Sequence, residues 1–251
     1  MKAIKRISLV LLVIMILFSV FITNGIIENG IVTSEINAFK NRAELFQVVG
    51  NTTYYTVKAK EGEDTSRHIK NNVNDRKIGA KGDIFVTSRN PLSESKVIGW
   101  ISKLTWIGHT AIVYDDEGKE TIEITGNLDP EENVVKVYTN TWINSTDTTP
   151  QIALLRIKNT TDDQRQKIID YAESKIGYGY NYTFLFNREN SFYCSDLVSR
   201  AAAYAEINVN YDYLAATGSD IIVSPETYIV YYRETRYEKG KAKFFVYYLV
   251  E

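Results

Sequence analysis

The sequence of 251 residues predicts one α+β domain behind a separate N-terminal leader. Three observations lead to this class. Short segments of alternating apolar and polar residues run from 83 to 157, two capped helical segments follow them, and no repeat or Pro/Gly-rich linker divides the chain. The apolar fraction of 44% and the charged fraction of 24% are those of an ordinary globular protein rather than a disordered one.

Residues 1–27 have the pattern of an export leader. Three basic residues precede an uninterrupted apolar run, and no acidic residue occurs before Glu28. This arrangement is typical of a secretory signal peptide. Extended through Ile26 and Ile27, the run of residues 7–22 would also reach the roughly 20 residues that a membrane-spanning helix needs. We therefore predict an extracytoplasmic protein, with two alternatives: a signal peptide cleaved after Gly25 or Ala38, or membrane attachment through residues 7–27.

The charge and the cysteine count exclude several classes of protein. The chain has 29 basic and 31 acidic residues, a formal net charge of −2 and no basic block, so it lacks the electrostatic footprint of a nucleic-acid-binding protein. One Cys and two His are too few for a structural zinc site. The glycines around 177–179 lack the third glycine of a dinucleotide-binding loop. We predict no metal, no cofactor and no nucleic-acid partner.

The spacing of apolar residues, and the polar turn residues between the segments, predict where the strands lie. In an N-terminal extension at 28–80, the apolar spacing of 35–49 predicts a helix and 52–57 predicts a strand. The domain proper, at 81–251, begins with a meander whose strands are joined by polar turns. Its strands are predicted at 83–88, 108–114, 120–125, 134–138 and 152–157, with an apolar helical stripe at 97–106.

Two helices follow the meander. Thr161 and Asp162 open the first, and Gly177 closes it. A segment rich in Tyr and Phe then leads to the second, at 194–206. The end of the chain, 225–251, is expected to hold a short helix and a terminal strand.

Cys194, the only cysteine, lies at the predicted start of the second helix. The helix dipole and the free backbone N–H groups at this end favour a thiolate, which lowers the thiol pKa and increases nucleophilicity at neutral pH. The alternative is an inert, buried cysteine. Because an unpaired thiol outside the cell is an oxidation liability, we interpret Cys194 as a nucleophile.

A thiolate nucleophile needs a base, and the chain has two histidines. His109 opens an apolar strand, which is an unusual place for an uncommitted imidazole. His68 lies in a polar stretch typical of a solvated surface. We predict that His109 is the base; the alternative is a half-buried histidine satisfied by its neighbours.

A third polar group is expected to orient the imidazole. A three-residue loop at 116–118 between two strands keeps the parity of the side chains, so that His109 and Glu123 share a face of the hairpin. A loop of even length would turn Glu123 away and leave Asn127 or a backbone group in this role. We predict Glu123, with a solvated strand carboxylate as the alternative.

These residues, in this order, resemble a known family. Cys194-Ser195-Asp196-Leu197-Val198 is similar to the Cys-Ser-Gly-Leu-Val motif of NlpC-type cell-wall cysteine peptidases, in which the His follows the Cys. Here the order is reversed. Gly82-Asp83-Ile84, Gly108-His109-Thr110, Glu123, Leu155-Arg156 and Tyr180 all precede Cys194. That order resembles the circularly permuted, YiiX/YebB-like branch of papain-like hydrolases, relatives of the lecithin–retinol acyltransferase group, over about residues 80–230.

The resemblance implies a fold and a set of site residues. The fold would be permuted papain-like, with a small, barrel-like antiparallel sheet packed on the helix that bears the nucleophilic cysteine. Cys194 matches the family nucleophile, His109 the base and Glu123 the third member. The residues expected to contact substrate are Tyr180, which matches a recurrent aromatic near the site, together with Tyr193 and Trp106.

The sequence departs from the family pattern beside Tyr180. Asn181 stands where family members often have Asp, and Gly179 where they often have Pro. Neither Asn181 nor Gly179 is one of the predicted catalytic residues. We therefore expect these two differences to affect the contacts with the substrate and not the reaction itself.

Three functions compete. The first is an exported cysteine hydrolase that cleaves an amide bond of a peptide or acyl-amide substrate, such as peptidoglycan, through an acyl-enzyme. The second uses the same site to hydrolyse or transfer a lipid acyl group, as the acyltransferase relatives do. The third is a non-catalytic surface binding module, which an intact set of Cys194, His109 and Glu123 disfavours.

Overall fold

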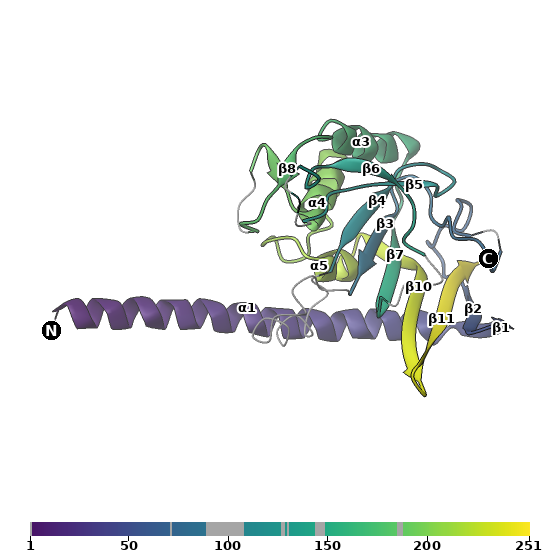
Figure 1. Cartoon of the computed structure of the whole chain (residues 1–251), viewed down its shortest axis with the longest axis horizontal. Helices are drawn as coiled ribbons and strands as arrows, with labels where there is room; N and C mark the ends of the chain where they lie inside the picture. Colours follow the sequence, from purple (N-terminus) through teal and green to yellow (C-terminus); the bar gives the residue numbers. More distant parts are fainter. Residues whose placement is uncertain are drawn as a thin grey trace.

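The computed structural model describes residues 2–70, 72–88, 108–126, 129, 131–143, 149–184 and 188–251. Its centre is one nine-stranded mixed sheet with the order β1-β2-β11-β10-β7-β3-β4-β5-β6 (Figure 1). The strands are β1 Ala43–Val49, β2 Thr52–Lys58, β3 Ile84–Thr87, β4 Thr110–Val113, β5 Glu120–Glu123, β6 Lys136–Thr139, β7 Gln151–Ile157, β10 Thr227–Glu238 and β11 Lys241–Val250. The remaining elements are α1 Lys2–Lys40, α3 Asp162–Glu173, α4 Cys194–Tyr204, α5 Gly218–Val223 and the short pair β8 Gly179–Tyr180 and β9 Ser191–Phe192.

The α+β class is confirmed, but the expectation of a small, barrel-like sheet is wrong. The sheet is large and open, with β1 and β6 at its two edges. Five strands, β3 to β7, come from the predicted meander, and hairpins from both ends of the chain extend it. These hairpins meet through β2 and β11, the one parallel pair within the nine-stranded sheet as described. Strands that pair across such a distance in sequence share no local sequence pattern that would reveal the pairing. The prediction therefore rested on the meander alone and gave a sheet that was too small.

Two predicted elements differ from the structure near the ends of the chain. The helix expected at 35–49 is divided between the end of α1 and strand β1. The short helix expected within 225–251 is absent there, because that segment forms the long hairpin of β10 and β11, and the short helix α5 precedes it. The meander strands and both later helices are confirmed near their predicted positions.

The two helices that matter for the site lie on the side of the domain that holds β4 to β6 (Figure 1). Helix α3 packs on α4, and α4 packs against β4, whose four residues are all buried. As predicted, α3 starts at Thr161, whose hydroxyl accepts the Gln164 N–H at 3.2 Å while the Gln164 side chain accepts the Thr161 N–H at 3.1 Å. This reciprocal cap satisfies two backbone donors of the first turn.

The hairpin of β4 and β5 has the predicted odd register. Ile112 pairs with Ile122, so odd-numbered residues of the two strands share one face. In the turn, the Asp115 carboxylate accepts three backbone N–H groups at 2.7–2.9 Å. Gly118 has φ +65°, and a Cβ there would lie 2.6 Å from the Ile78 carbonyl oxygen, so the turn requires glycine at this position.

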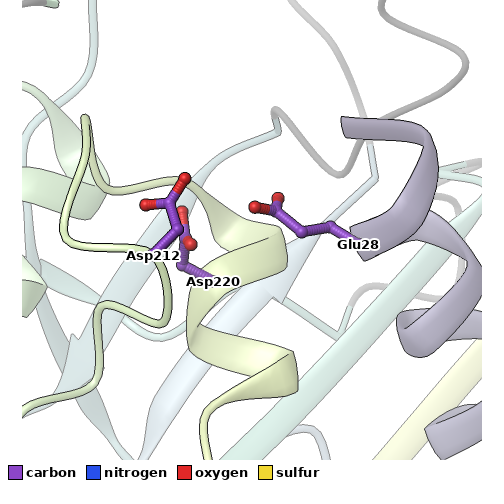
Figure 2. Close-up of side chains that lie close together, drawn as sticks. All are labelled: Glu28, Asp212 and Asp220. Carbon is purple, nitrogen blue, oxygen red and sulfur yellow. The ribbon is translucent and has the colours of Figure 1, made fainter. Parts of the chain in front are cut away.

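Helix α1 packs on the domain through its C-terminal half, while its N-terminal half projects beyond the domain (Figure 1). The buried positions of this half recur every three or four residues and form one stripe. They include Glu28, Val32, Ile36 and Phe39. Glu28 points from α1 toward Asp212 and Asp220 beside α5 (Figure 2). Among the residues that the structure describes, no helix combines the length and apolarity that a membrane crossing requires.

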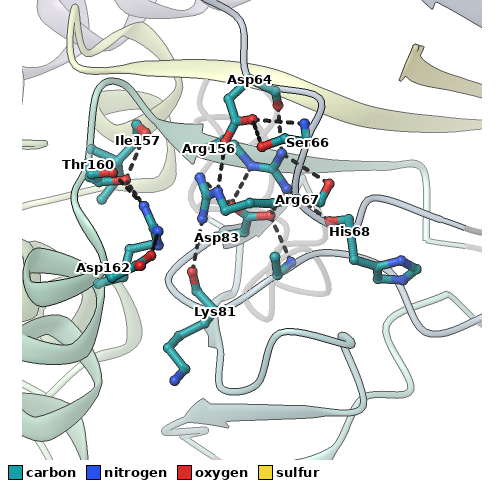
Figure 3. Close-up of polar contacts among 12 residues, drawn as sticks. Asp64, Ser66, Arg67, His68, Lys81, Asp83, Arg156, Ile157, Thr160 and Asp162 are labelled. Carbon is teal, nitrogen blue, oxygen red and sulfur yellow. Dashed lines mark hydrogen bonds and ion pairs between the residues drawn. The ribbon is translucent and has the colours of Figure 1, made fainter. Parts of the chain in front are cut away.

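Arg156 of β7 joins the N-terminal extension to the sheet (Figure 3). Its guanidinium donates to both carboxylate oxygens of Asp83, from Nε at 2.9 Å and from Nη2 at 2.7 Å. The same group donates to the backbone carbonyls of Asp64 at 2.7 Å and His68 at 2.9 Å. Both charged side chains are fully buried, so the pair holds the segment around Asp64 and His68 against the sheet.

Candidate active site

Three segments that are distant in sequence meet at one end of β4. Cys194 is the first residue of α4, His109 immediately precedes β4, and Glu123 is the last residue of β5. The odd register places Glu123 diagonally across from His109 on the same face, and α4 packs against β4. The structure therefore brings together the three residues that the sequence singled out.

The His109 imidazole is held by a buried carboxylate. Its Nε2 is hydrogen-bonded to Glu123 Oε2. The other oxygen of Glu123 accepts the Thr121 hydroxyl at 2.9 Å and the Trp142 indole N–H at 3.4 Å. Burial raises the pKa of Glu123, but the hydrogen bond and the charge of His109 outweigh it and leave the pKa lowered. Glu123 is therefore ionised and fixed in orientation.

The Cys194 thiol and the imidazole shift each other toward their charged forms. Burial raises the pKa of Cys194, but its hydrogen bond to His109 and the charge of His109, with further contacts from Thr110, lower it overall. For His109, burial lowers the pKa, and the contacts with Cys194 and Glu123 outweigh it and raise the pKa to about 10. Since Nε2 is bound to Glu123, Nδ1 is the nitrogen left for the thiol. The site therefore favours a thiolate–imidazolium pair.

The first turn of α4 places backbone N–H groups near the Cys194 sulfur. The cap residue, Tyr193, makes no side-chain hydrogen bond to the helix among the described residues, and the first N–H groups of a helix have no intrahelical acceptor. These donors lie beside Cys194 and are suited to bind an oxyanion. The Cys194 residue is 8% exposed, so its side chain is largely buried. The His109 side chain is 28% exposed and is the more open member of the pair.

A cavity of about 530 Å³ opens beside the imidazole. Its lining includes His109, Glu123, Tyr138 and Trp142. The Trp142 ring stacks on His109 with centroids 5.3 Å apart and planes 14° apart, and on Phe85 at 4.9 Å. It covers the imidazole and also donates to Glu123. No signal in the sequence indicates this role for Trp142, because it lies three residues after the end of β6, in a loop with no periodic pattern or motif.

An aromatic cluster lies on the cysteine side of the site. The Tyr180 ring contacts the rings of Tyr182 and Phe184, and Phe184 also contacts Tyr193, with centroids 4.9–6.1 Å apart. Burial, followed by the charge of Cys194, raises the pKa of Tyr180, which places that ring near the sulfur. The predicted substrate contacts Tyr180 and Tyr193 are thus both beside Cys194.

The sequence also singled out Trp106, Asn127 and His68. Trp106 and Asn127 lie outside the described residues. His68 is in the N-terminal extension, where its Nε2 is 3.0 Å from the Lys77 carbonyl oxygen.

Comparison with known proteins identifies the family. The model of the permuted papain-like amidases, YaeF/YiiX, C92 family, matches residues 79–239. A solved structure similar to this chain is that of the metalloprotein YiiX from Escherichia coli O157:H7, with 17% sequence identity and a TM-score of 0.47, covering 60% of this chain and 96% of that one. No curated protein matches the chain. The chain belongs to the permuted papain-like amidases of the YaeF/YiiX, C92 family, and it is a hydrolase of the cysteine peptidase and amidase type.

Proposed function

We propose that this enzyme is exported and hydrolyses an amide bond, with Cys194, His109 and Glu123 as its catalytic triad. The observation that supports this most strongly is the hydrogen bond between His109 and the buried Glu123 carboxylate, at a place where the neighbouring His109 lowers the pKa of Cys194 and the Cys194 sulfur lies 3.8 Å from the carbonyl oxygen of Gly108. A lowered thiol pKa beside a charged imidazole is the arrangement that activates a cysteine nucleophile.

In the proposed reaction, the Cys194 thiolate attacks the amide carbonyl carbon, and the oxyanion is stabilised by N–H groups at the start of α4. His109 gives its proton to the leaving amine as the C–N bond breaks, and a thioester to Cys194 remains. His109 then removes a proton from a water molecule that attacks the thioester, which releases the acid and restores the thiol. Glu123 holds the imidazole in one orientation throughout.

The nucleophile can be tested with a thiol-reactive acyl probe. Wild type will be labelled and active, whereas Cys194→Ala will lose labelling and turnover, because no thiolate remains. The fold will persist, since the change removes only a sulfur atom at a helix start. Ser199→Ala, on the same helix and partly exposed, is the matched control and will keep both signals. Hydrolysis by Cys194→Ala at the wild-type rate would refute the mechanism, and failure to label wild type would favour a non-catalytic binding module.

The pH dependence tests the role of Glu123. In wild type, kcat/KM will rise as the Cys194 thiol ionises, below the usual thiol value of 9.0, and fall near pH 10 as His109 loses its proton. Glu123→Gln removes the charge and hydrogen bond that raise the pKa of His109, so the alkaline limb will move to lower pH. Glu120→Gln, at the exposed end of the same strand, is the control and will leave the limb in place. An unchanged alkaline limb in Glu123→Gln would remove Glu123 from the triad.

We propose a peptide amide of the cell wall as the substrate, because export would bring the site to that polymer. The aromatic cluster beside Cys194 supports a second candidate, a lipid acyl group, since Tyr182 and Phe184 are 59% and 44% exposed next to the nucleophile. Release of amines from muropeptides, compared with hydrolysis of an acyl-lipid by the same preparation, distinguishes the two. Cys194→Ala should abolish whichever activity is found.

Export is proposed from the leader and can be tested by cell fractionation. Full-length protein expressed in a bacterium will be found outside the cytoplasm or in the membrane fraction, and deletion of residues 2–27 will leave it in the cytoplasm. The buried stripe from Glu28 to Phe39 supports retention of that part of α1, which argues against cleavage after Ala38. The mass of the exported form distinguishes an intact anchor from cleavage after Gly25. Full-length protein in the cytoplasm would contradict the proposal.

A further inference from the structure

Three carboxylates from separate segments meet where α1 packs beside α5. They belong to Glu28, Asp212 and Asp220, and one oxygen from each lies within 4.8 Å of the others (Figure 2). Glu28 and Asp220 are 4% and 1% exposed. Among the described residues, none of the three takes part in an ion pair. Three like charges this close in a buried place repel one another strongly, so the cluster needs a positive charge or a proton.

Asp220 provides a second observation that points to a ligand. Its Oδ2 accepts the backbone N–H and the hydroxyl of Thr217, at 2.8 Å and 2.7 Å, and so caps α5. Its Oδ1 is buried and accepts no hydrogen bond of normal geometry in the part of the chain that the structure describes, although the backbone N–H of Asp212 lies close enough to offset part of the rise that burial causes in the pKa of this carboxyl. A buried carboxylate oxygen in this state is strongly unfavourable unless something else binds it.

Asn24 donates hydrogen bonds to the carboxylates of Glu28 and Asp212 but does not neutralise their charge. One turn before Glu28 on α1, its Nδ2 donates to Glu28 Oε1 at 2.6 Å and to Asp212 Oδ2 at 2.8 Å. The amide fixes the positions of both carboxylates but carries no charge. The result is a preformed set of oxygen atoms, supplied by a helix, a loop and the start of a second helix.

We propose that Glu28, Asp212 and Asp220 bind a divalent cation that prefers oxygen ligands, and that this ion fastens α1 to the segment leading into α5. The donor set contains only carboxylates, which suits Ca²⁺ or Mg²⁺ rather than zinc. Ca²⁺ fits better, because oxygens up to about 4.8 Å apart can share an ion at 2.3–2.6 Å, whereas Mg²⁺ needs ligands at about 2.0–2.1 Å. Water molecules would complete the six to eight ligands of Ca²⁺.

The location gives the ion a structural role near the nucleophile. The segment between Asp212 and Asp220 includes Ala216, whose carbonyl accepts the Ser195 hydroxyl at 2.7 Å. Ser195 follows Cys194 in α4. The cation would therefore fix the segment between Asp212 and Asp220, which also contacts α4 through the hydrogen bond from Ser195 to Ala216. Glu28 lies outside the part of the chain that matches the family, so the site depends on α1 of this protein.

The test uses the full chain in detergent, treated with EDTA and returned to EDTA-free buffer. Calorimetric titration with CaCl₂ is expected to give one ion per wild-type chain, and at a hundredfold excess over Kd the Tm should rise by about 5–10 °C. Glu28→Gln and Asp220→Asn will lose both signals. Glu35→Gln, which removes the same charge from an exposed position of α1, is the matched control and will keep them. MgCl₂ should give a smaller shift.

Two results would overturn the proposal. One is the absence of heat and of a Tm shift in wild type, and the other is an equal response in Glu28→Gln. If a shared proton, rather than a cation, neutralises the cluster, wild type itself will not respond to Ca²⁺ and Glu28→Gln will be more stable than wild type at neutral pH, which also overturns the proposal. If Asp220→Asn fails to fold because the α5 cap is weakened, Asp212→Asn on the loop replaces it.

Discussion

Replacing His109 with Ala will lower kcat/KM by about 10,000-fold or more, whereas His68→Ala will leave it near the wild-type value. His109 contacts both the nucleophile and Glu123, so its loss removes the proton donor for the leaving group and the charge that keeps Cys194 ionised. His68 makes its side-chain contact with the Lys77 carbonyl in the extension. Steady-state kinetics with a chromogenic amide, after circular dichroism has verified folding, measures both variants.

The two histidines form a matched pair, because no other histidine exists in the chain. A large loss in His68→Ala with little loss in His109→Ala would show that the wrong imidazole had been identified. Added imidazole offers a further readout. It should restore part of the activity of His109→Ala, since the neighbouring cavity admits a small molecule, and it should not affect Cys194→Ala.

Arg156→Met will lower the free energy of unfolding by about 3–5 kcal/mol. The change leaves the buried Asp83 carboxylate without its bidentate partner, and it removes two donors to the carbonyls of Asp64 and His68 (Figure 3). Urea denaturation followed by tryptophan fluorescence measures the effect. Lys167→Met, which breaks an exposed pair with Asp163 on α3, is the control and will leave the free energy of unfolding near the wild-type value.

A second substitution separates the unpaired charge from the lost packing. Adding Asp83→Asn to Arg156→Met removes the buried charge, so the double variant should recover part of the lost stability. A cost below about 1 kcal/mol for Arg156→Met alone would show that this pair does not hold the extension to the sheet.

The parts of the site that the sequence predicted are those fixed by local chemistry. Asp115 and Gly118 define the turn, and the turn length alone decides that Glu123 shares a face with His109. One cysteine and two histidines leave few combinations for a thiolate and its base. The predicted helix start therefore indicated Cys194, the small number of histidines indicated His109, and the parity of the strands indicated Glu123 as its neighbour.

The parts that the sequence did not predict depend on distant pairing. Nothing near 52–58 or 241–250 indicates that β2 lies beside β11, so the size of the sheet was underestimated. Trp142 reaches His109 only because the chain after β6 folds back over the site. The carboxylates of Glu28, Asp212 and Asp220 are likewise brought together by packing between α1 and α5, which no spacing in the sequence reveals.

The parallel pairing of β2 and β11 also determines when the protein can finish folding. Thr52 pairs with Phe244, so most of the chain separates the two strands, and contacts of this kind form late and slowly. The chain is synthesised from its N-terminus, and β11 is the last strand to be made. Until its ten residues are available to pair between β2 and β10, each of those two strands has an edge without a partner. A chain that loses those ten residues would therefore keep two unprotected strand edges, and we expect it to aggregate rather than to fold with reduced stability.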